Sequence, residues 1–214
     1  MIHKLEGIII NQKKYSEADK IITILSKEKG KITTIAKSAR KSTSKKTAQI
    51  DLGNYCKFSI AKAKGMGVLT EVKLVEEFET TSLAQNLLAF YLFELTDKLM
   101  QEDEKDERVL ELLKSFTSIV ILDFERLEFI FVTKILSDLG FLDVEGIQSD
   151  RVRKILKYYK NNSLKEGVKV ALSQQDKQVI RELLQRSLED TIERRLKSYK
   201  LYLSSINKGN RDGK

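Results

Sequence analysis

The chain has 214 residues, a formal net charge of +8, one cysteine and one histidine. This length accommodates one domain or two small ones, because globular domains usually contain about 100 to 200 residues. A lone Cys56 and a lone His3 exclude a disulfide framework and a zinc site built from these residue types, so we expect no metal. They also leave only His3 as the base of a Ser-His-Asp triad, which disfavours that class of hydrolase.

Charge is distributed along the chain in three blocks of opposite sign. Residues 1–75 contain 16 Lys and Arg against 6 Asp and Glu, residues 76–150 contain 6 against 18, and residues 151–214 contain 17 against 7. This alternation favours two domains over one. We interpret the acidic middle block as ordinary solvated helix surface, with the docking of a partner as the alternative.

The sequence offers no segment suited to a membrane. No apolar run approaches the roughly 18 to 20 residues that a membrane span needs. The opening segment MIHKLEGIII has too short an apolar core for a signal peptide. We therefore expect a cytoplasmic protein with no membrane partner.

Five short segments rich in β-branched residues predict strands in the first third of the chain. They are residues 8–10, 20–25, 31–36, 55–61 and 68–75. Five strands in about seventy residues predict a small closed or nearly closed barrel, because closure removes exposed strand edges. Within the alternating pattern of the fourth segment, Cys56, Phe58 and Ile60 share one face, and we expect all three in the core.

The spacing of apolar residues becomes helical after Phe78. Ser82 and Gln85 form a capping-box pattern at the start of the first predicted helix. Its apolar stripe contains Leu83, Leu87, Leu88, Tyr91, Leu92, Leu95 and Leu99. Further helices are predicted at residues 107–122, 124–139 and 150–160, and from residue 174 to about 206. The last should bend or break near residues 187–191, because its apolar residues step by four and drift about 40° per step.

Six residues between the first two predicted helices, 102–107, have the sequence EDEKDE. Such a run could in principle bind Mg²⁺, but consecutive carboxylates point in several directions, whereas the ligands of a metal must converge. We therefore predict a solvated loop or a helix start, where the helix dipole favours acidic residues.

Residues 29–50 contain seven Lys and Arg and no Asp or Glu. Such a concentration of like charge indicates either an anionic partner or a solvated loop. A small barrel with a basic loop commonly binds single-stranded nucleic acid, because each neutralised phosphate releases condensed counterions. Tyr15, Tyr55 and Phe58 are the only aromatic residues among the first 75, so we expect mostly electrostatic and weakly sequence-selective binding.

Several segments together resemble the RecO family of DNA repair proteins. They are EGIIINQKKYSEADKIITILSKEKGKITTIAKSARK, GMGVLTEVKLVE, LLAFYLFELTDKL, ILSDLGF and RRLKSYKLYL, in the order of the family. The resemblance implies an α+β protein in which an OB-fold-like five-stranded barrel, residues 1–78, precedes an all-α domain, residues 79–214. It also implies a protein that is not an enzyme and needs no cofactor.

The resemblance to RecO implies a recombination mediator. Members of the family bind single- and double-stranded DNA, anneal complementary strands, work with RecR and help RecA displace the single-strand-binding protein. Contacts with DNA phosphate are implied for the basic loop, residues 37–46, which contains Lys37, Arg40, Lys41, Lys45 and Lys46. An OB-fold RNA-binding or translation-associated protein is the alternative, and the helical segments disfavour it.

A second cationic segment, ERRLKSYKLYL, lies near the end of the chain. Its cations are Arg194, Arg195, Lys197 and Lys200. The C-terminus of a helix favours such residues in any protein. The cations also adjoin more apolar surface than one core stripe requires, which would suit an acidic peptide with an apolar end. The resemblance implies such a ligand, the C-terminal tail of the single-strand-binding protein, and we assign these four residues to it as a hypothesis.

Two departures from the RecO pattern stand out. The family usually has glycine where this chain has Ser38, so the backbone of the basic loop could differ there. Many members carry a four-cysteine zinc module, whereas residues 141–165 contain no cysteine. We therefore expect this region to be stabilised by packing alone.

Overall fold

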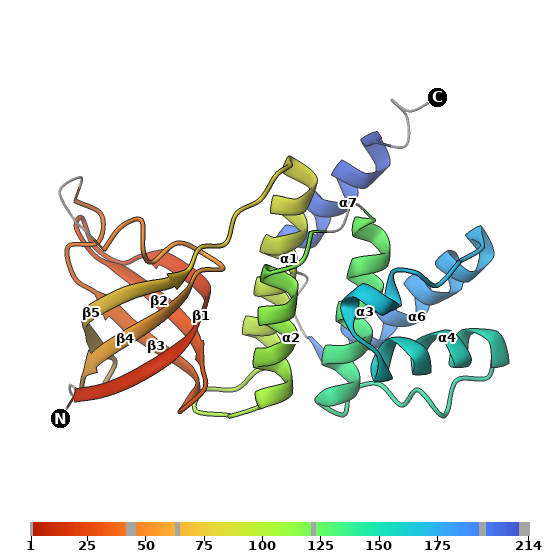
Figure 1. Cartoon of the computed structure of the whole chain (residues 1–214), viewed down its shortest axis with the longest axis horizontal. Coiled ribbons are helices and arrows are strands. Elements are labelled where there is room, and N and C mark those ends of the chain that lie inside the picture. The colour runs from red at the N-terminus through yellow and green to blue at the C-terminus, as the bar shows by residue number, and fades with distance from the viewer. Residues whose placement is uncertain (1, 42–45, 63–64, 121–122, 193–195, 210–214) are drawn as a thin grey trace. The chain divides into compact units, whose positions relative to one another are not determined.

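The computed structural model describes residues 2–41, 46–62, 65–120, 123–192 and 196–209. Within these residues the strands precede the helices, which confirms the predicted α+β class (Figure 1). The strands are β1 Ile2–Lys14, β2 Lys20–Ser26, β3 Gly30–Ala36, β4 Tyr55–Ala61 and β5 Gly67–Glu76. Four agree with the predicted segments to within a residue or so. The exception is β1, which was predicted only at residues 8–10.

The five strands form a closed barrel in the order β1-β2-β3-β5-β4. Neighbours are antiparallel except β3 and β5, which close the barrel in parallel through Thr34–Gly67 and Ile35–Val68. β1 is long because its first half pairs with β4 and its second half with β2. An irregularity in its pairing with β2, between Ile9 and Asn11, is the kind of feature that bends a strand between two partners. The predicted barrel is therefore confirmed.

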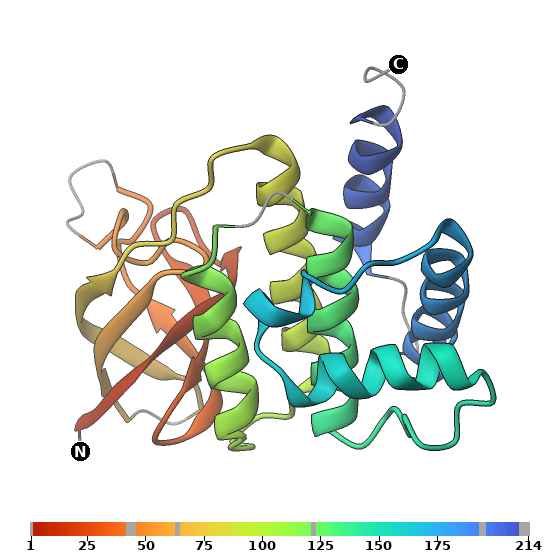
Figure 2. The same ribbon diagram turned by 45° about the vertical axis from the view of Figure 1, so that its right-hand side comes forward.

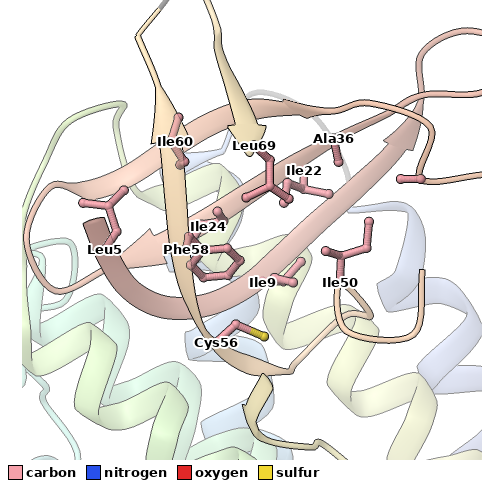
Figure 3. Packing of buried hydrophobic residues seen from close by; sticks show 11 residues of the cluster. Leu5, Ile9, Ile22, Ile24, Ala36, Ile50, Cys56, Phe58, Ile60 and Leu69 are labelled. Atoms are coloured by element: carbon pink, nitrogen blue, oxygen red, sulfur yellow. The ribbon is translucent and has the colours of Figure 1, made fainter. Parts of the chain in front are cut away.

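The interior of the barrel is filled by branched aliphatic side chains around Phe58 (Figure 3). Cys56 and Ile60 lie in the same core, as the alternation along β4 predicted. Burial raises the pKa of the Cys56 thiol to about 12, so the group stays protonated and unreactive at neutral pH. Its role is that of a small buried hydrophobe.

The chain divides into two compact units that are not continuous in sequence. Unit 1 contains residues 1–79 and 93–117, and unit 2 contains residues 80–92 and 118–214. Helix α1, Leu83–Leu99, contributes a segment to each unit. The domain boundary expected after residue 78 divides strands from helices, whereas these units are defined by compactness. That boundary stays a prediction.

Unit 1 adds helix α2, Glu107–Thr117, to the barrel. Asp106 caps it, because its Oδ1 accepts hydrogen bonds from the backbone N–H of Arg108 at 2.9 Å and of Val109 at 3.3 Å. The helix was predicted to continue to residue 122 but ends at Thr117. The run that follows, from Ile119, is β-branched and has lower helix propensity. Residues 121 and 122 lie outside the described part of the chain.

Helix α1 starts as predicted but buries less of its stripe. The Oγ of Ser82 accepts a hydrogen bond from the Gln85 N–H at 3.2 Å, and the Gln85 side chain accepts one from the Thr81 N–H at 2.9 Å. Leu83, which we expected in the buried stripe, is exposed, and burial of the stripe begins at Leu88.

Unit 2 is built around helix α3, Phe124–Asp138 (Figure 2). Three further helices pack against α3: α4 Asp150–Asn161, α5 Leu164–Gly167 and α6 Gln174–Thr191. Side chains of Asp123, Ser149 and Ser173 cap α3, α4 and α6. The Ser149 cap was predicted, whereas the single turn of α5 was not. No helix of the described segments is long and apolar enough to cross a membrane.

A break separates α6 from helix α7, Lys197–Gly209. Helix α6 ends at Thr191, the last residue of the range in which the break was predicted, and Ile192 has extended backbone. The hydroxyl groups of Ser187 and Thr191 donate to the carbonyls of Leu183 and Ser187, at 3.1 and 2.6 Å. Such bonds to the preceding turn bend and weaken a helix. The predicted break is confirmed.

Candidate nucleic-acid interface

The basic loop, residues 37–46, extends from the end of β3. Lys37, Arg40 and Lys41 are exposed, whereas Ala39 between them is fully buried in the barrel core. Ile50 is buried in the same core after the loop. The loop is therefore anchored by apolar side chains, while the side chains of Lys37, Arg40 and Lys41 are exposed. Lys45 lies outside the described residues.

Two cations of this loop bind the barrel's own backbone. The ammonium of Lys46 donates to the carbonyl of Leu69 on β5 at 3.1 Å. The guanidinium of Arg40 donates to the carbonyl of Ser16, and its backbone N–H donates to that of Ala18 at 2.9 Å. These two residues contribute positive charge, but they also hold the loop in place. Of the described cations of the loop, Lys37 and Lys41 are the better placed to contact a ligand.

The basic loop lies against the β1–β2 loop, residues 15–19. Besides the Arg40 bonds, Asp19 joins the two loops, because its Oδ1 accepts a hydrogen bond from the Ser38 N–H at 2.8 Å. Two further exposed cations, Lys13 and Lys14 at the end of β1, directly precede the β1–β2 loop, which itself carries Glu17 and Asp19. We call the surface of residues 13–19 and 37–41 the barrel-end face.

Lys13 and Lys14 were missed as site residues in the sequence. They precede the basic loop by more than twenty residues, and only the pairing of the two loops adds them to it. The available signal was the adjacency of two lysines and a tyrosine at the end of a strand.

Ser38 keeps the backbone conformation that glycine favours. Its φ is 57°, in the left-handed region that residues with a Cβ rarely adopt. A glycine here, as in the RecO pattern, would adopt the same φ without steric cost.

Lys31, in the stretch that first suggested an anionic partner, has an internal role. Its ammonium lies 3.2 Å from the Asp97 carboxylate and donates to the carbonyl of Met100 at 2.9 Å. Two further contacts pair the backbone of Lys31 with that of Asp103 and Glu104. The acidic segment 102–107 is thus the exposed loop that was predicted, with its start pinned beside β3.

The cationic segment predicted to bind a peptide is only partly described. Arg194 and Arg195 lie outside the described residues, whereas Lys197 and Lys200 are exposed on α7. Several of the apolar side chains beside these cations pack within unit 2 and are not free for a ligand. Leu196 is buried, and the Tyr199 ring lies 4.8 Å from the Tyr91 ring. Leu201 is the residue of that group that remains exposed.

The region without cysteines, residues 141–165, is held by packing and charge. Helix α4 buries Val152, Ile155, Leu156 and Tyr159. Arg151 binds the Asp176 carboxylate through two hydrogen bonds, of 2.6 and 2.8 Å, which lowers the pKa of that carboxyl. Within the described ranges no three His, Cys, Asp or Glu side chains are grouped so as to hold a metal ion. That the protein binds no zinc stays a prediction.

A closed five-stranded barrel with a cationic face, followed by helices, defines an α+β protein with an OB-fold-like N-terminal domain. Residues 1–78 match the family model described as "Recombination protein O N terminal". Through this N-terminal domain the chain is similar to the RecO family, in agreement with the resemblance seen in its sequence.

Curated relatives named DNA repair protein RecO agree with this assignment. The chain is 33% identical over 115 residues to that of Halalkalibacterium halodurans, a match that covers 53% of this chain and 45% of the relative. It is 33% identical over 144 residues to that of Caldicellulosiruptor bescii, covering 64% and 58%. It is 34% identical over 119 residues to that of Bacillus velezensis, a match that covers 54% of this chain and 47% of the relative. The chain spans about half the length of the curated relatives it matches.

Proposed function

We propose that this protein is a non-enzymatic RecO-family mediator of DNA repair. It binds single- and double-stranded DNA, anneals complementary strands, works with RecR and helps load RecA onto DNA coated by single-strand-binding protein. The names of the relatives support a role in DNA repair. The observation that carries the proposal is the barrel-end face, where two loops tied together by Asp19 and Arg40 present exposed lysines.

The chemistry of this face favours binding over catalysis. Its described exposed cations are Lys13, Lys14, Lys37, Arg40 and Lys41. Ammonium groups on an ordered support suit phosphates at successive positions of a strand, whose neutralisation releases counterions. Because such contacts do not read bases, they fit a mediator that must act on any sequence.

A strand-annealing assay with complementary oligonucleotides coated by single-strand-binding protein tests this proposal. The variant Lys37→Glu/Lys41→Glu should lose annealing and DNA affinity while keeping its circular dichroism spectrum. Both side chains are exposed, so their replacement should have little effect on the fold. A matched reversal in unit 2, Lys154→Glu/Lys165→Glu, changes net charge equally and should retain both activities. Equal losses in the two variants would contradict the proposal.

The alternative, an OB-fold RNA-binding protein, predicts a different preference. A single strand of RNA differs from DNA at the 2′-hydroxyl, which RNA-binding sites recognise. Competition between DNA and RNA strands of the same sequence separates the two functions. We expect equal or tighter binding of DNA, and a preference for RNA of tenfold or more would favour the alternative.

The acidic C-terminal tail of the single-strand-binding protein remains our proposed ligand for Arg194, Arg195, Lys197 and Lys200. The exposure of Lys197, Lys200 and Leu201 on α7 supports it, because acidic and apolar groups of a peptide could both be satisfied there. Reversing Arg194, Arg195 and Lys197 should weaken binding of a labelled tail peptide and leave DNA binding by the barrel-end face largely intact. An unchanged peptide affinity would rule out this site.

A further inference from the structure

Tyr15 is an exposed aromatic residue of the barrel-end face. Its side chain is 55% exposed, and it directly follows Lys13 and Lys14. With the residues that the structure describes, its ring makes no ring–ring or cation–π contact. Contacts of these two kinds within the described residues therefore do not account for a tyrosine at this position.

The backbone that carries Tyr15 is held on both sides. The preceding residue, Lys14, pairs with Lys20 in the β1–β2 ladder. The Tyr15 N–H donates to the carbonyl of Asp19 at 3.2 Å, and the Asp19 carboxylate accepts the Ser38 N–H of the basic loop. The ring is therefore carried by a braced backbone that follows Lys14 and is tied to the basic loop, so little backbone order has to be created when a ligand binds.

The other aromatic residues of the N-terminal part are occupied elsewhere. Phe58 is buried in the barrel core. The Tyr55 hydroxyl contacts the Glu6 carboxylate at 3.2 Å, and the Lys114 ammonium lies 5.2 Å from the centre of its ring. Among the three aromatic residues of the first 75, Tyr15 alone is both exposed and next to the cations of this face.

We propose that Tyr15 is the base-stacking residue of the barrel-end face. Its ring stacks on an unpaired base of a single strand while the neighbouring lysines bind the flanking phosphates. This inference rests on the proposed DNA binding and adds a preference to it. A duplex keeps its bases stacked on one another and offers none to Tyr15, whereas phosphate contacts are available on both forms. Tyr15 therefore favours single strands, and the lysines do not discriminate.

Substitution separates the two contributions. Tyr15→Ala should weaken single-strand binding by roughly 5- to 150-fold, the range of one lost base–aromatic stack, and leave duplex affinity and the salt dependence unchanged. Tyr15→Phe keeps the ring and should keep the preference. Lys37→Glu/Lys41→Glu should instead weaken both forms of DNA and flatten the salt dependence.

A direct test uses the absence of tryptophan from the chain. Tyr15→Trp introduces a single indole, whose fluorescence should be quenched by oligothymidylate but not by a duplex, with binding followed in parallel by anisotropy of labelled DNA. The matched control is Tyr158→Trp on α4, where a 40% exposed tyrosine also stands among lysines. Quenching confined to position 15, with a reduced single-strand preference in Tyr15→Ala, supports the inference.

Two outcomes would overturn it, and they differ from failure of the proposed function. Salt-dependent DNA binding with no quenching at position 15, or with equal quenching at position 158, leaves DNA binding intact and rejects stacking by Tyr15. An unchanged preference for single strands in Tyr15→Ala also rejects stacking by Tyr15. Absence of salt-dependent binding in the wild-type protein would reject the proposed function and the stacking role together.

Discussion

The ammonium of Lys31 and the carboxylate of Asp97 form a largely buried ion pair between β3 and the end of α1, within unit 1. Their side chains are only 12% and 11% exposed. The Lys31 ammonium also donates to the carbonyls of Asp97 and Met100, at 2.5 and 2.9 Å, and Asn11 donates to the Asp97 carboxylate at 2.6 Å. Lys31 thus neutralises a carboxylate and also caps carbonyls at the C-terminus of α1.

Removing one partner of this pair should be costly. Lys31→Ala leaves Asp97 buried without its cation and should lower the free energy of unfolding by about 2 to 4 kcal/mol. Lys57→Ala is the control, because it breaks a 2.9 Å pair with Glu6 in which the side chains are 58% and 36% exposed, and it should cost much less than Lys31→Ala. Urea unfolding of both variants measures the difference, and equal losses would contradict it.

The same pair shows what could not be predicted from the sequence. Lys31 belongs to a run of seven basic residues, and local charge suggested one role for all of them. Its partner Asp97 is 66 residues away and is brought close only because the end of α1 lies beside Lys31 in the fold. A run of like charges in a sequence predicts the sign of a surface. It does not predict which of these residues form ion pairs, because that depends on contacts between distant segments.

Local patterns predicted the elements that local physics determines. Alternation along β4 and the serine cap of α4 were read correctly because each depends on neighbouring residues. The full length of β1 and the single turn of α5 were missed. β1 extends through polar residues because it has a partner strand along each half. In the same way, Lys13 and Lys14 join the candidate site only through the contact between two loops.

A second prediction concerns strain at Ser38. A left-handed residue with a side chain costs about 1 to 2 kcal/mol, and glycine relieves it at an entropic cost of roughly half that amount. Ser38→Gly should therefore raise the free energy of unfolding by about 0.5 to 1 kcal/mol without changing DNA affinity. Ser204→Gly, on the exposed side of α7, is the control and should be destabilising. Thermal unfolding tests both, and a less stable Ser38→Gly would exclude strain at this position.

A third prediction quantifies the electrostatics of the barrel-end face. If Lys13, Lys14, Lys37 and Lys41 each meet one phosphate of a single strand, the logarithm of affinity should fall with the logarithm of salt concentration at a slope of roughly −3. The variant Lys37→Glu/Lys41→Glu should reduce the steepness of that slope by about 1.4. Fluorescence anisotropy across a salt series measures both slopes. A wild-type slope near zero would remove phosphate contacts as the source of affinity.

The last prediction concerns Glu128, a buried carboxyl in α3 that sequence reasoning did not single out. It is only 4% exposed, and its Oε2 has no hydrogen-bond partner within the described structure. Burial is the main reason that its pKa is raised to about 7. The positive charge of Arg181 and a hydrogen bond from the Tyr202 hydroxyl lower the pKa, and the negative charge of Glu125 raises it slightly. The carboxyl is therefore largely protonated in the folded protein under mildly acidic conditions.

This raised pKa makes stability depend on pH with a definite sign. Below about pH 4.5 Glu128 is protonated in both states, and between about pH 4.5 and 7 it ionises in the unfolded chain first, so stability falls as pH rises through that window. Glu128→Gln cannot ionise and should be more stable than wild type by about 1 to 3 kcal/mol at pH 8, with little difference near pH 4.5. Glu182→Gln, on an exposed position of α6, controls for the loss of one negative charge. Urea unfolding at the two pH values measures the effect, and a Glu128→Gln variant that is less stable at pH 8 would show that the buried carboxylate is compensated in the folded protein.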